Sequence, residues 1–209
     1  MMLPRRMAVN VCAGYALALL AFVPAAAQPD SRLKQKLPEA PKQLPSVNAH
    51  GKSLDFLFEA LKAAPDEESA RAVEARIWAI WMKTPSDTVA LLMSRASIAL
   101  GHNESDVALK LLDAIIKLRP DYTEAWNRRA TLYYKKNDYT RAMEDIEEVL
   151  RREPRHFGAL AGLGVILEET GDDKHALEVF RRALAINPHL DKVPEMVKTL
   201  SEKVEGRDI

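Results

Sequence analysis

The sequence predicts an all-α fold, a solenoid of helical hairpins that ends in a C-terminal capping helix. Two observations lead to this prediction. Prolines that follow apolar helical stretches recur every 34 residues, at Pro120, Pro154 and Pro188. Small residues keep the same spacing in two further registers, Ala108, Ala142 and Ala176, and Ala96, Ala130 and Gly164. A fixed period of this length is typical of repeat proteins in which each unit is a pair of packed helices.

The remaining columns of the repeat follow the pattern of a known family. When repeats are counted from residues 89, 123 and 157, a large apolar residue stands at position 4, small residues at 8 and 20, a large residue at 24 and proline at 32. This pattern resembles the tetratricopeptide repeat. The resemblance implies three repeats, residues 89–122, 123–156 and 157–190. Small residues at positions 8 and 20 let the two helices of a repeat approach closely, and the bulky residues fill the space around that contact.

Each repeat also carries signals for the turn between its two helices. Position 15 is occupied by Asn103, Asn137 and Gly171, residue types that tolerate the left-handed conformation that ends a helix. An acidic residue follows each time, namely Glu104, Asp138 and Asp172. A negative charge is favourable there because it lies beside the N-terminal dipole of the next helix.

The N-terminus has the composition of a secretory signal peptide. Arg5 and Arg6 precede an apolar stretch from Val9 to Val23, and a run of alanines ends at Ala27. We therefore expect residues 1–27 to be cleaved, with no transmembrane segment afterwards and a periplasmic location. The single cysteine, Cys12, lies inside this segment, so the mature chain would depend on its core rather than on disulfides.

Three further segments flank the repeats. Residues 28–52 are rich in proline and predict a disordered tether. Residues 53–88 fit the repeat template loosely and predict a degenerate N-terminal helical pair, in which Leu61 and Val73 replace the small residues. Residues 191–209 predict an amphipathic capping helix and a tail. Without the signal peptide, 28 basic residues face 30 acidic ones, a balance that argues against a nucleic-acid partner.

The third repeat begins with an unusual density of glycine. Gly164 stands at position 8, where helix packing accounts for it. Gly158 and Gly162 stand at positions 2 and 6, and each costs roughly 1 kcal/mol of helix propensity. They predict either a groove cleared for a partner's backbone or space for a bulky neighbour such as Tyr133 or Tyr134. The sequence alone does not decide between these two interpretations.

The family resemblance implies a concave groove lined by positions 2, 5, 6, 9 and 12 of each first helix. With the adjoining linkers, the candidate partner-binding residues are Met93, Ser97, Glu124, Asn127, Arg128, Thr131, Tyr134, Arg155, His156, Gly158, Ala161, Gly162 and Val165. Some relatives clamp a partner's C-terminal carboxylate with Lys, Asn and Arg at these positions. Here only Asn127 and Arg128 match that set, which disfavours recognition of a carboxylate-terminal tail.

Position 7, which is normally apolar in the family, is arginine in two repeats. Arg95 and Arg129 could each be held by carboxylates of the second helices, with Asp113 and Asp145 as the candidates. We expect such structural pairs in preference to ligand contacts.

No constellation in the sequence predicts catalysis, a metal site or a cofactor. The five histidines are scattered, and His156 with Glu124 or Glu168 is the best remaining candidate for an enzyme or metal site. The sequence therefore predicts an exported, non-catalytic adaptor that binds a protein or peptide segment and serves in the cell envelope. The alternative is a homo-oligomeric scaffold that stacks through its end faces.

Overall fold

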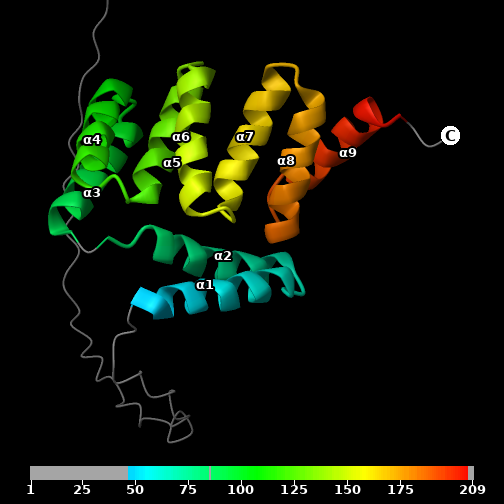
Figure 1. Cartoon of the computed structure of the whole chain (residues 1–209), viewed down its shortest axis with the longest axis horizontal. Coiled ribbons are helices and arrows are strands. Elements are labelled where there is room, and N and C mark those ends of the chain that lie inside the picture. The colour runs from blue at the N-terminus through cyan, green and yellow to red at the C-terminus, as the bar shows by residue number, and fades with distance from the viewer. Residues whose placement is uncertain (1–46, 85, 207–209) are drawn as a thin grey trace, which may run out of the picture. The chain divides into compact units, whose positions relative to one another are not determined.

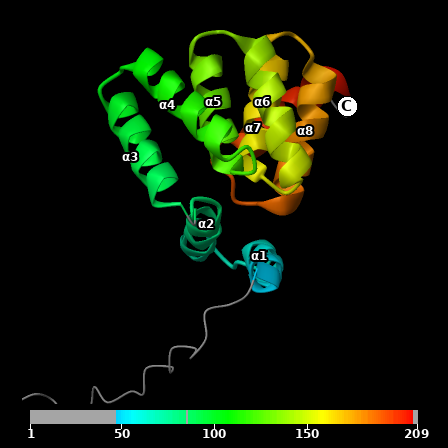
Figure 2. The ribbon, with the colours of Figure 1, turned by 60° about the vertical axis from the view of Figure 1, so that its left-hand side comes forward.

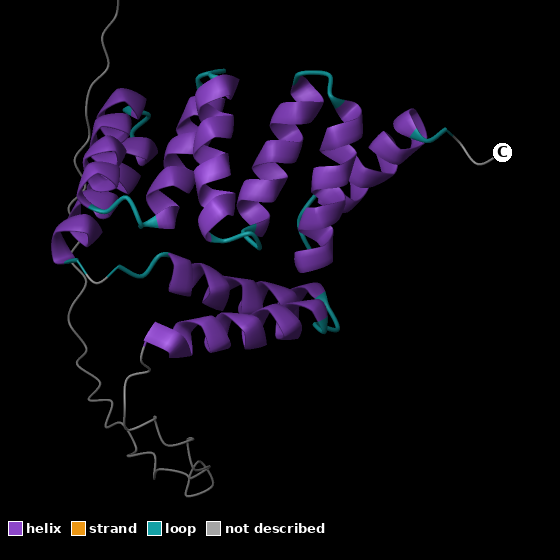
Figure 3. Ribbon diagram, viewed as in Figure 1, coloured by secondary structure: helices purple, strands orange, loops and turns teal. Residues whose placement is uncertain are grey.

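The computed structural model describes residues 47–84 and 86–206, and all regular structure within them is helical (Figures 1 and 3). In chain order the helices are α1 (Val47–Lys62), α2 (Glu67–Trp81), α3 (Asp87–Gly101), α4 (Ser105–Leu118), α5 (Thr123–Lys135), α6 (Tyr139–Arg152), α7 (Phe157–Glu169), α8 (Asp173–Ile186) and α9 (Val193–Val204). The predicted fold class is confirmed. The predicted signal peptide, residues 28–46 of the predicted tether and residues 207–209 lie outside the described residues.

The six helices from α3 to α8 form three antiparallel pairs that stand in a row (Figure 1). We number the pairs α3–α4, α5–α6 and α7–α8 as repeats 1, 2 and 3. The second and third pairs lie within the predicted bounds, whereas α3 begins at Asp87, before residue 89. Each pair also contacts the next, through α4 and α5 and through α6 and α7. Across the described part of the chain, no helix combines the length and the apolar character that crossing a bilayer requires.

The turns inside the repeats have the conformation that the sequence predicts. Asn103, Asn137 and Gly171 have φ angles of 61°, 58° and 84°. The side chains of Asp138 and Asp172 then accept hydrogen bonds from backbone N–H groups in the first turns of α6 and α8. Glu104, at the same position in repeat 1, makes no such bond to α4, and glutamate is not among the residues preferred as N-caps.

The core is made of the repeat columns. Ala96, Ala108 and Leu112 of repeat 1 are completely buried, and Ala142 and Ala176 repeat this in the next two pairs. In repeat 3, Gly164 lies against the ring of Phe180, which is also completely buried. At the C-terminal end, Val193 and Leu200 of α9 join the cluster around Phe180, so α9 covers the end of the row.

The N-terminal pair differs from the sequence-based expectation in both extent and placement. Helix α1 begins at Val47, so residues 47–52, which the sequence assigned to the tether, are helical. The hairpin α1–α2 also does not extend the row of repeats. It crosses the ends of α5 to α8 where the turns between repeats lie (Figures 1 and 2). Phe157 at the start of α7 is completely buried in one cluster with Leu57, Phe58 and Ile77 of the hairpin.

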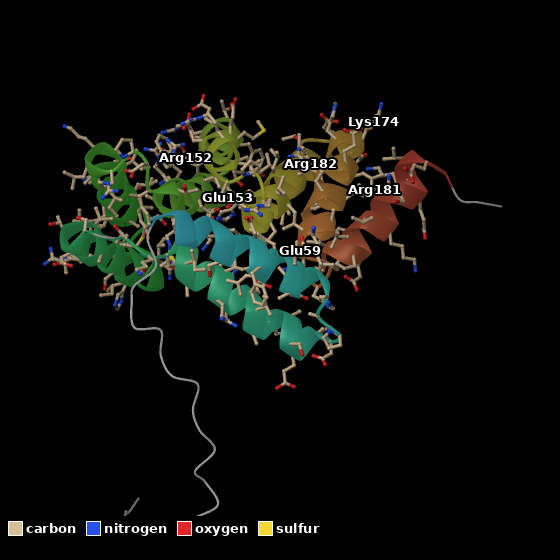
Figure 4. All side chains as sticks on the ribbon, turned by 60° about the horizontal axis from the view of Figure 1, so that its bottom comes forward. Glu59, Arg152, Glu153, Lys174, Arg181 and Arg182 are labelled. Atoms are coloured by element: carbon tan, nitrogen blue, oxygen red, sulfur yellow. The ribbon has the colours of Figure 1, made fainter. Side chains whose placement is uncertain are left out.

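Polar contacts fix the hairpin in this position. Asn187 Nδ2 donates a hydrogen bond of 3.1 Å to Glu74 Oε2, and His189 Nε2 lies 3.2 Å from the carbonyl oxygen of Ala64. Figure 4 views this side of the molecule, with Glu59 on α1 and Glu153 on the turn beside it. The physical reason for this placement is the size of the side chains. Leu61 and the aromatic residues of α2 are too large for the close helix contact that small residues make in the repeats, and they pack instead on a wide apolar surface.

Candidate partner-binding groove

The first helices of the repeats, α3, α5 and α7, form one face, which we call the first-helix face. Helices α5 and α7 contact each other across it. Between them lies an open, mostly apolar pocket of about 150 Å³. Its lining residues are Asn127, Ala130, Thr131, Tyr134, Ile146, Gly158, Ala159, Gly162, Val165 and Ile166. We refer to it as the α5–α7 pocket.

The three glycines of α7 have three different surroundings. A Cβ atom on Gly164 would lie 2.5 Å from Phe180 Cε1, so this glycine is required by packing within the repeat, as expected. A Cβ on Gly158 would lie 3.0 Å from Cη2 of Trp78, so this glycine accommodates a bulky neighbour. That neighbour comes from α2 and not from Tyr133 or Tyr134. A Cβ on Gly162 would meet only Cδ1 of Ile146, at 3.9 Å. Only Gly162 therefore faces open space in the pocket.

Polar groups with fixed positions surround the pocket. The hydroxyl of Thr131 donates to the carbonyl of Asn127, whose Nδ2 donates in turn to Glu124. At the other side, the hydroxyl of Tyr134 donates a 2.6 Å hydrogen bond to Glu169. This bond to a carboxylate raises the pKa of Tyr134 to about 12 and lowers the pKa of Glu169. The rim beside Tyr134 is therefore anionic at neutral pH.

A second hollow lies on the same face, beside α3. It has a volume of about 220 Å³ and is lined by Met82, Thr84, Ala90, Met93, Ser94, Ser97 and Tyr122. Arg128 separates it from the α5–α7 pocket, since its guanidinium donates to Ser97 Oγ at 3.0 Å and to Glu124 at 3.3 Å. The predicted residues Met93, Ser97 and Arg128 thus come together, although Met93 itself is buried in the core of repeat 1.

Several predicted groove residues instead contact the chain's own N-terminal hairpin. His156 is completely buried, and its ring stacks on Trp81 with the centroids 4.2 Å apart. Its Nδ1 accepts a hydrogen bond from Ala159 N–H, which caps α7. Arg155 forms a 2.6 Å ion pair with Asp55, and its guanidinium lies over the ring of Phe58.

The hairpin therefore covers His156 and contacts Arg155 and Gly158, while Glu124 is buried beside His156. Among the predicted residues, Ala161 also faces away from the pocket, toward the cluster that α8 and α9 share. The open part of the predicted site is smaller than the sequence implied. It consists of Asn127, Thr131, Tyr134, Gly162 and Val165 at the α5–α7 pocket, with Ser97 and Arg128 at the second hollow.

The covering role of the hairpin is what the sequence did not predict. The replacement of the small residues by Leu61 and Val73 left the packing angle of this pair open. Trp78 and Trp81, two large aromatic residues close together in one helix, are the sequence feature that could have indicated a large apolar contact outside the pair. Nothing in the sequence identified His156 and Phe157 as the surface that they contact.

The structure brings together His156 and Glu124, which the sequence named as a candidate pair for an enzyme or metal site. His156 Nε2 lies 3.6 Å from Glu124 Oε2, both side chains are buried, and the His156 ring is stacked on Trp81 of α2. No group of three or more His, Cys, Asp or Glu side chains suited to a metal ion occurs within residues 47–84 and 86–206.

The arginines at position 7 have different environments. Arg129 is held as expected, since it donates to Asp145 at 2.7 and 2.8 Å and to Asp113 at 2.7 Å. These two carboxylates raise the pKa of Arg129 above its usual range. Arg95 is exposed and makes no such pair with the described residues, which differs from the expectation.

Comparison with known proteins agrees with the repeat geometry. The family model of the tetratricopeptide repeat matches residues 93–148 and 128–191. A TPR repeat-containing protein of Rhizobium etli is 42% identical over 153 residues, which cover 73% of this chain and 75% of that protein. The chain belongs to the tetratricopeptide repeat family. A more distant relative is the photosystem I assembly protein Ycf3 of Prochlorococcus marinus, 30% identical over 108 residues that cover 47% of this chain and 60% of Ycf3.

Solved structures of tetratricopeptide repeat domains share the fold. The first such domain of Spaghetti (RPAP3), bound to an HSP90 peptide, superposes with a TM-score of 0.55. It is 14% identical, and the match covers 58% of this chain and 97% of that domain. Tetratricopeptide repeat proteins are generally non-catalytic scaffolds, and none of the relatives named here is described as an enzyme.

Proposed function

We propose that this tetratricopeptide repeat protein is a non-catalytic adaptor that binds a segment of another protein on its first-helix face. The segment places one apolar side chain in the α5–α7 pocket. The observation that carries this proposal is the open space beside Gly162. This position of α7 has no side chain, and among the described residues only Cδ1 of Ile146 would lie within 4 Å of a Cβ atom there. A cavity of about 150 Å³ lined by apolar side chains accepts a group as large as benzene. A leucine or phenylalanine side chain therefore matches the pocket.

The rim of the pocket supports binding of an internal segment over binding of a chain terminus. Glu169 places a carboxylate beside Tyr134 at the rim, while Arg128 is already paired with the buried Glu124 and bonded to Ser97. A partner's terminal carboxylate would meet like charge at Glu169, and none of the described residues that line the pocket is basic. A basic residue a few positions from the apolar anchor would instead be attracted by Glu169.

The same proposal includes export to the periplasm and a role in the cell envelope. Its support is the composition of residues 1–27, with two arginines, an apolar stretch and a terminal run of small residues. Mass spectrometry of the protein purified from its source should find a mature N-terminus at Gln28, in the fraction released by osmotic shock. An intact Met1 or a location in the spheroplast fraction would refute the export part alone.

The adaptor part is tested by filling the pocket. We would express the tagged chain in cells of its source, crosslink, and compare the partners captured by the wild type with those captured by Gly162→Trp. Gly101→Trp is the matched control, because a Cβ on Gly101 would have no neighbour within 4 Å and Gly101 lies at the end of α3, outside the pocket. A partner lost only with Gly162→Trp supports the proposal, provided that the helicity of both variants matches the wild type. Partners retained by both variants would refute it.

A further inference from the structure

The first helices of repeats 2 and 3 each bury two apolar positions against the preceding repeat. In α5 these are Ala125 and Leu132, exposed by 0% and 1%, and both belong to the buried cluster of α3 and α4. In α7 the corresponding residues, 34 positions later, are Ala159 and Ile166, exposed by 2% and 1% and buried with residues of α6. These positions are therefore buried by contact with the preceding repeat.

The same two positions are uncovered in α3. Leu91 and Ile98 are exposed by 55% and 59%, because no repeat precedes α3 and the α1–α2 hairpin lies elsewhere. Figure 2 shows α3 at the free edge of the row. Of the large hydrophobic side chains exposed in the described chain, most lie in repeat 1, namely Leu91, Ile98, Val107 and Leu118. The exposed apolar surface is therefore concentrated at this end of the solenoid.

The charge between these two positions indicates what would cover them. Arg95 stands between Leu91 and Ile98 on α3, as Arg129 stands between Ala125 and Leu132 on α5. Arg129 takes one carboxylate, Asp145, from its own repeat and one, Asp113, from α4 of the preceding repeat. In repeat 1 the position of Asp145 is occupied by Leu111, so Arg95 has no carboxylate of its own repeat to pair with.

We propose that Leu91, Arg95 and Ile98, which we call the α3 face, are a docking site for an amphipathic helix of a partner protein. The partner helix presents apolar residues together with a carboxylate that pairs with Arg95. Helix α4 is the template for it, since Leu112 and Ile116 share the buried cluster with α5 while Asp113 binds Arg129. This surface lies apart from the α5–α7 pocket and does not depend on it.

Other occupants fit the α3 face less well. Two α3 faces brought together would oppose two Arg95 guanidinium groups. The opposite end of a second copy would offer α9, whose exposed residues include Pro194, Glu195 and Lys198, with Val204 as its one large hydrophobic exposed by more than a third among the described residues. Residues 28–46 of the chain itself carry four basic and two acidic side chains, which does not complement an arginine.

The test uses two components. One is a capped, fluorescein-labelled peptide of residues 103–120, which contains the α4 sequence, and the other is the protein purified from its cells in whatever processed form they produce. Fluorescence anisotropy should show saturable binding that Arg95→Glu weakens by about tenfold or more, as expected for a lost charge-assisted bond. Arg182→Glu is the matched control, because Arg182 is also exposed and lies on α8, far along the row (Figure 4). A peptide that carries Asp113→Lys should reverse the preference and bind the Arg95→Glu protein more tightly than the wild type.

Any of three binding results would overturn the proposal. They are equal affinity for the wild type and Arg95→Glu, an equal loss with Arg182→Glu, and unchanged binding to Ile98→Asp. A molecular mass that rises with concentration in the wild type and not in Ile98→Asp would assign the α3 face to a second copy and also overturn it. The Gly162→Trp protein should bind the peptide like the wild type, so that failure of the pocket proposal remains distinguishable.

Discussion

Two glycines in one helix should respond in opposite ways to the same substitution. Gly162→Ala and Gly164→Ala each add one methyl group to α7, two residues apart. Both gain helix propensity, roughly 1 kcal/mol relative to glycine. At Gly162 the new Cβ would lie 3.9 Å from Ile146, an ordinary contact. At Gly164 it would lie 2.5, 2.6 and 2.8 Å from three ring carbons of Phe180.

The difference between the two variants isolates the cost of overpacking. Phe180 is completely buried, so its ring has no free space to move into. Adding a methyl group to a packed core costs about 1–3 kcal/mol. We therefore expect Gly162→Ala to raise the free energy of unfolding by about 0.5–1 kcal/mol. Gly164→Ala should lie about 1–3 kcal/mol below Gly162→Ala, since the propensity gain cancels in that comparison.

Urea denaturation followed by circular dichroism measures both variants, and a double variant supplies the control. Repeats 1 and 2 combine alanine at position 8 with Leu112 and Ile146 at position 24, while repeat 3 combines glycine with Phe180. Phe180→Leu should therefore rescue Gly164→Ala, with a coupling free energy of about 0.5–3 kcal/mol. The packing argument is refuted if Gly164→Ala is as stable as Gly162→Ala. It is also refuted if the free-energy changes of Gly164→Ala and Phe180→Leu simply add in the double variant.

Three further predictions concern other contacts. Asp145→Asn should lower the free energy of unfolding, measured in urea, by about 1–3 kcal/mol, because Asp145 is buried and the Arg129 guanidinium would lose the charge of this partner. Asp113→Asn should lower it by less than about 1 kcal/mol, because the Asp113 side chain is half exposed. Trp81→Ala should destabilise the α1–α2 hairpin by about 2–4 kcal/mol, seen as faster hydrogen exchange in residues 53–82 while α5 to α8 stay protected. Glu169→Gln should lower the melting temperature at pH 7 but much less at pH values below 4.5, the ordinary pKa of the carboxyl. The reason is that the hydrogen bonds from Tyr134 and Tyr139 lower the pKa of Glu169, so its contribution is present above 4.5 and is lost as the pH falls through the folded pKa.

Each of these predictions has a clear contrary outcome. Equal effects of the two aspartate variants would show that burial does not set the value of the Arg129 pairs. Uniform loss of protection along the whole chain in Trp81→Ala would show that the hairpin and the repeats unfold together. A constant difference in melting temperature from pH 7 to pH 3 for Glu169→Gln, with Glu178→Gln as the exposed control, would show that the carboxylate charge is irrelevant to stability.

The repeats could be predicted from sequence because their physics is local. Position 15 needs a left-handed residue, and Asn103, Asn137 and Gly171 supply it within the same few residues that form the turn. Helix pairing likewise follows from small residues at fixed spacing, so the register of three repeats is visible without any knowledge of distant contacts. The confirmed fold rests on these columns.

The α1–α2 hairpin and part of the site could not be predicted in this way. The hairpin is placed by contacts across about a hundred residues, such as Arg155 with Asp55, and no period in the sequence marks them. The same contacts decide which groove positions are open, so His156 and Gly158 look like groove residues in the repeat frame yet lie under Trp78 and Trp81. Gly162 lies open because the side chains of the hairpin reach Gly158, one turn earlier in α7, and not Gly162.

The most direct test of the adaptor proposal is site-specific photocrosslinking from the pocket. A benzoylphenylalanine at Thr131, which is exposed at the rim of the α5–α7 pocket, should crosslink the partner in cells of the source organism. The same residue at Glu178, exposed on α8, is the control position. We predict a partner adduct from position 131 that disappears with Gly162→Trp, and none from position 178. An adduct only from position 178, or one from position 131 that persists with Gly162→Trp, would contradict binding in the pocket.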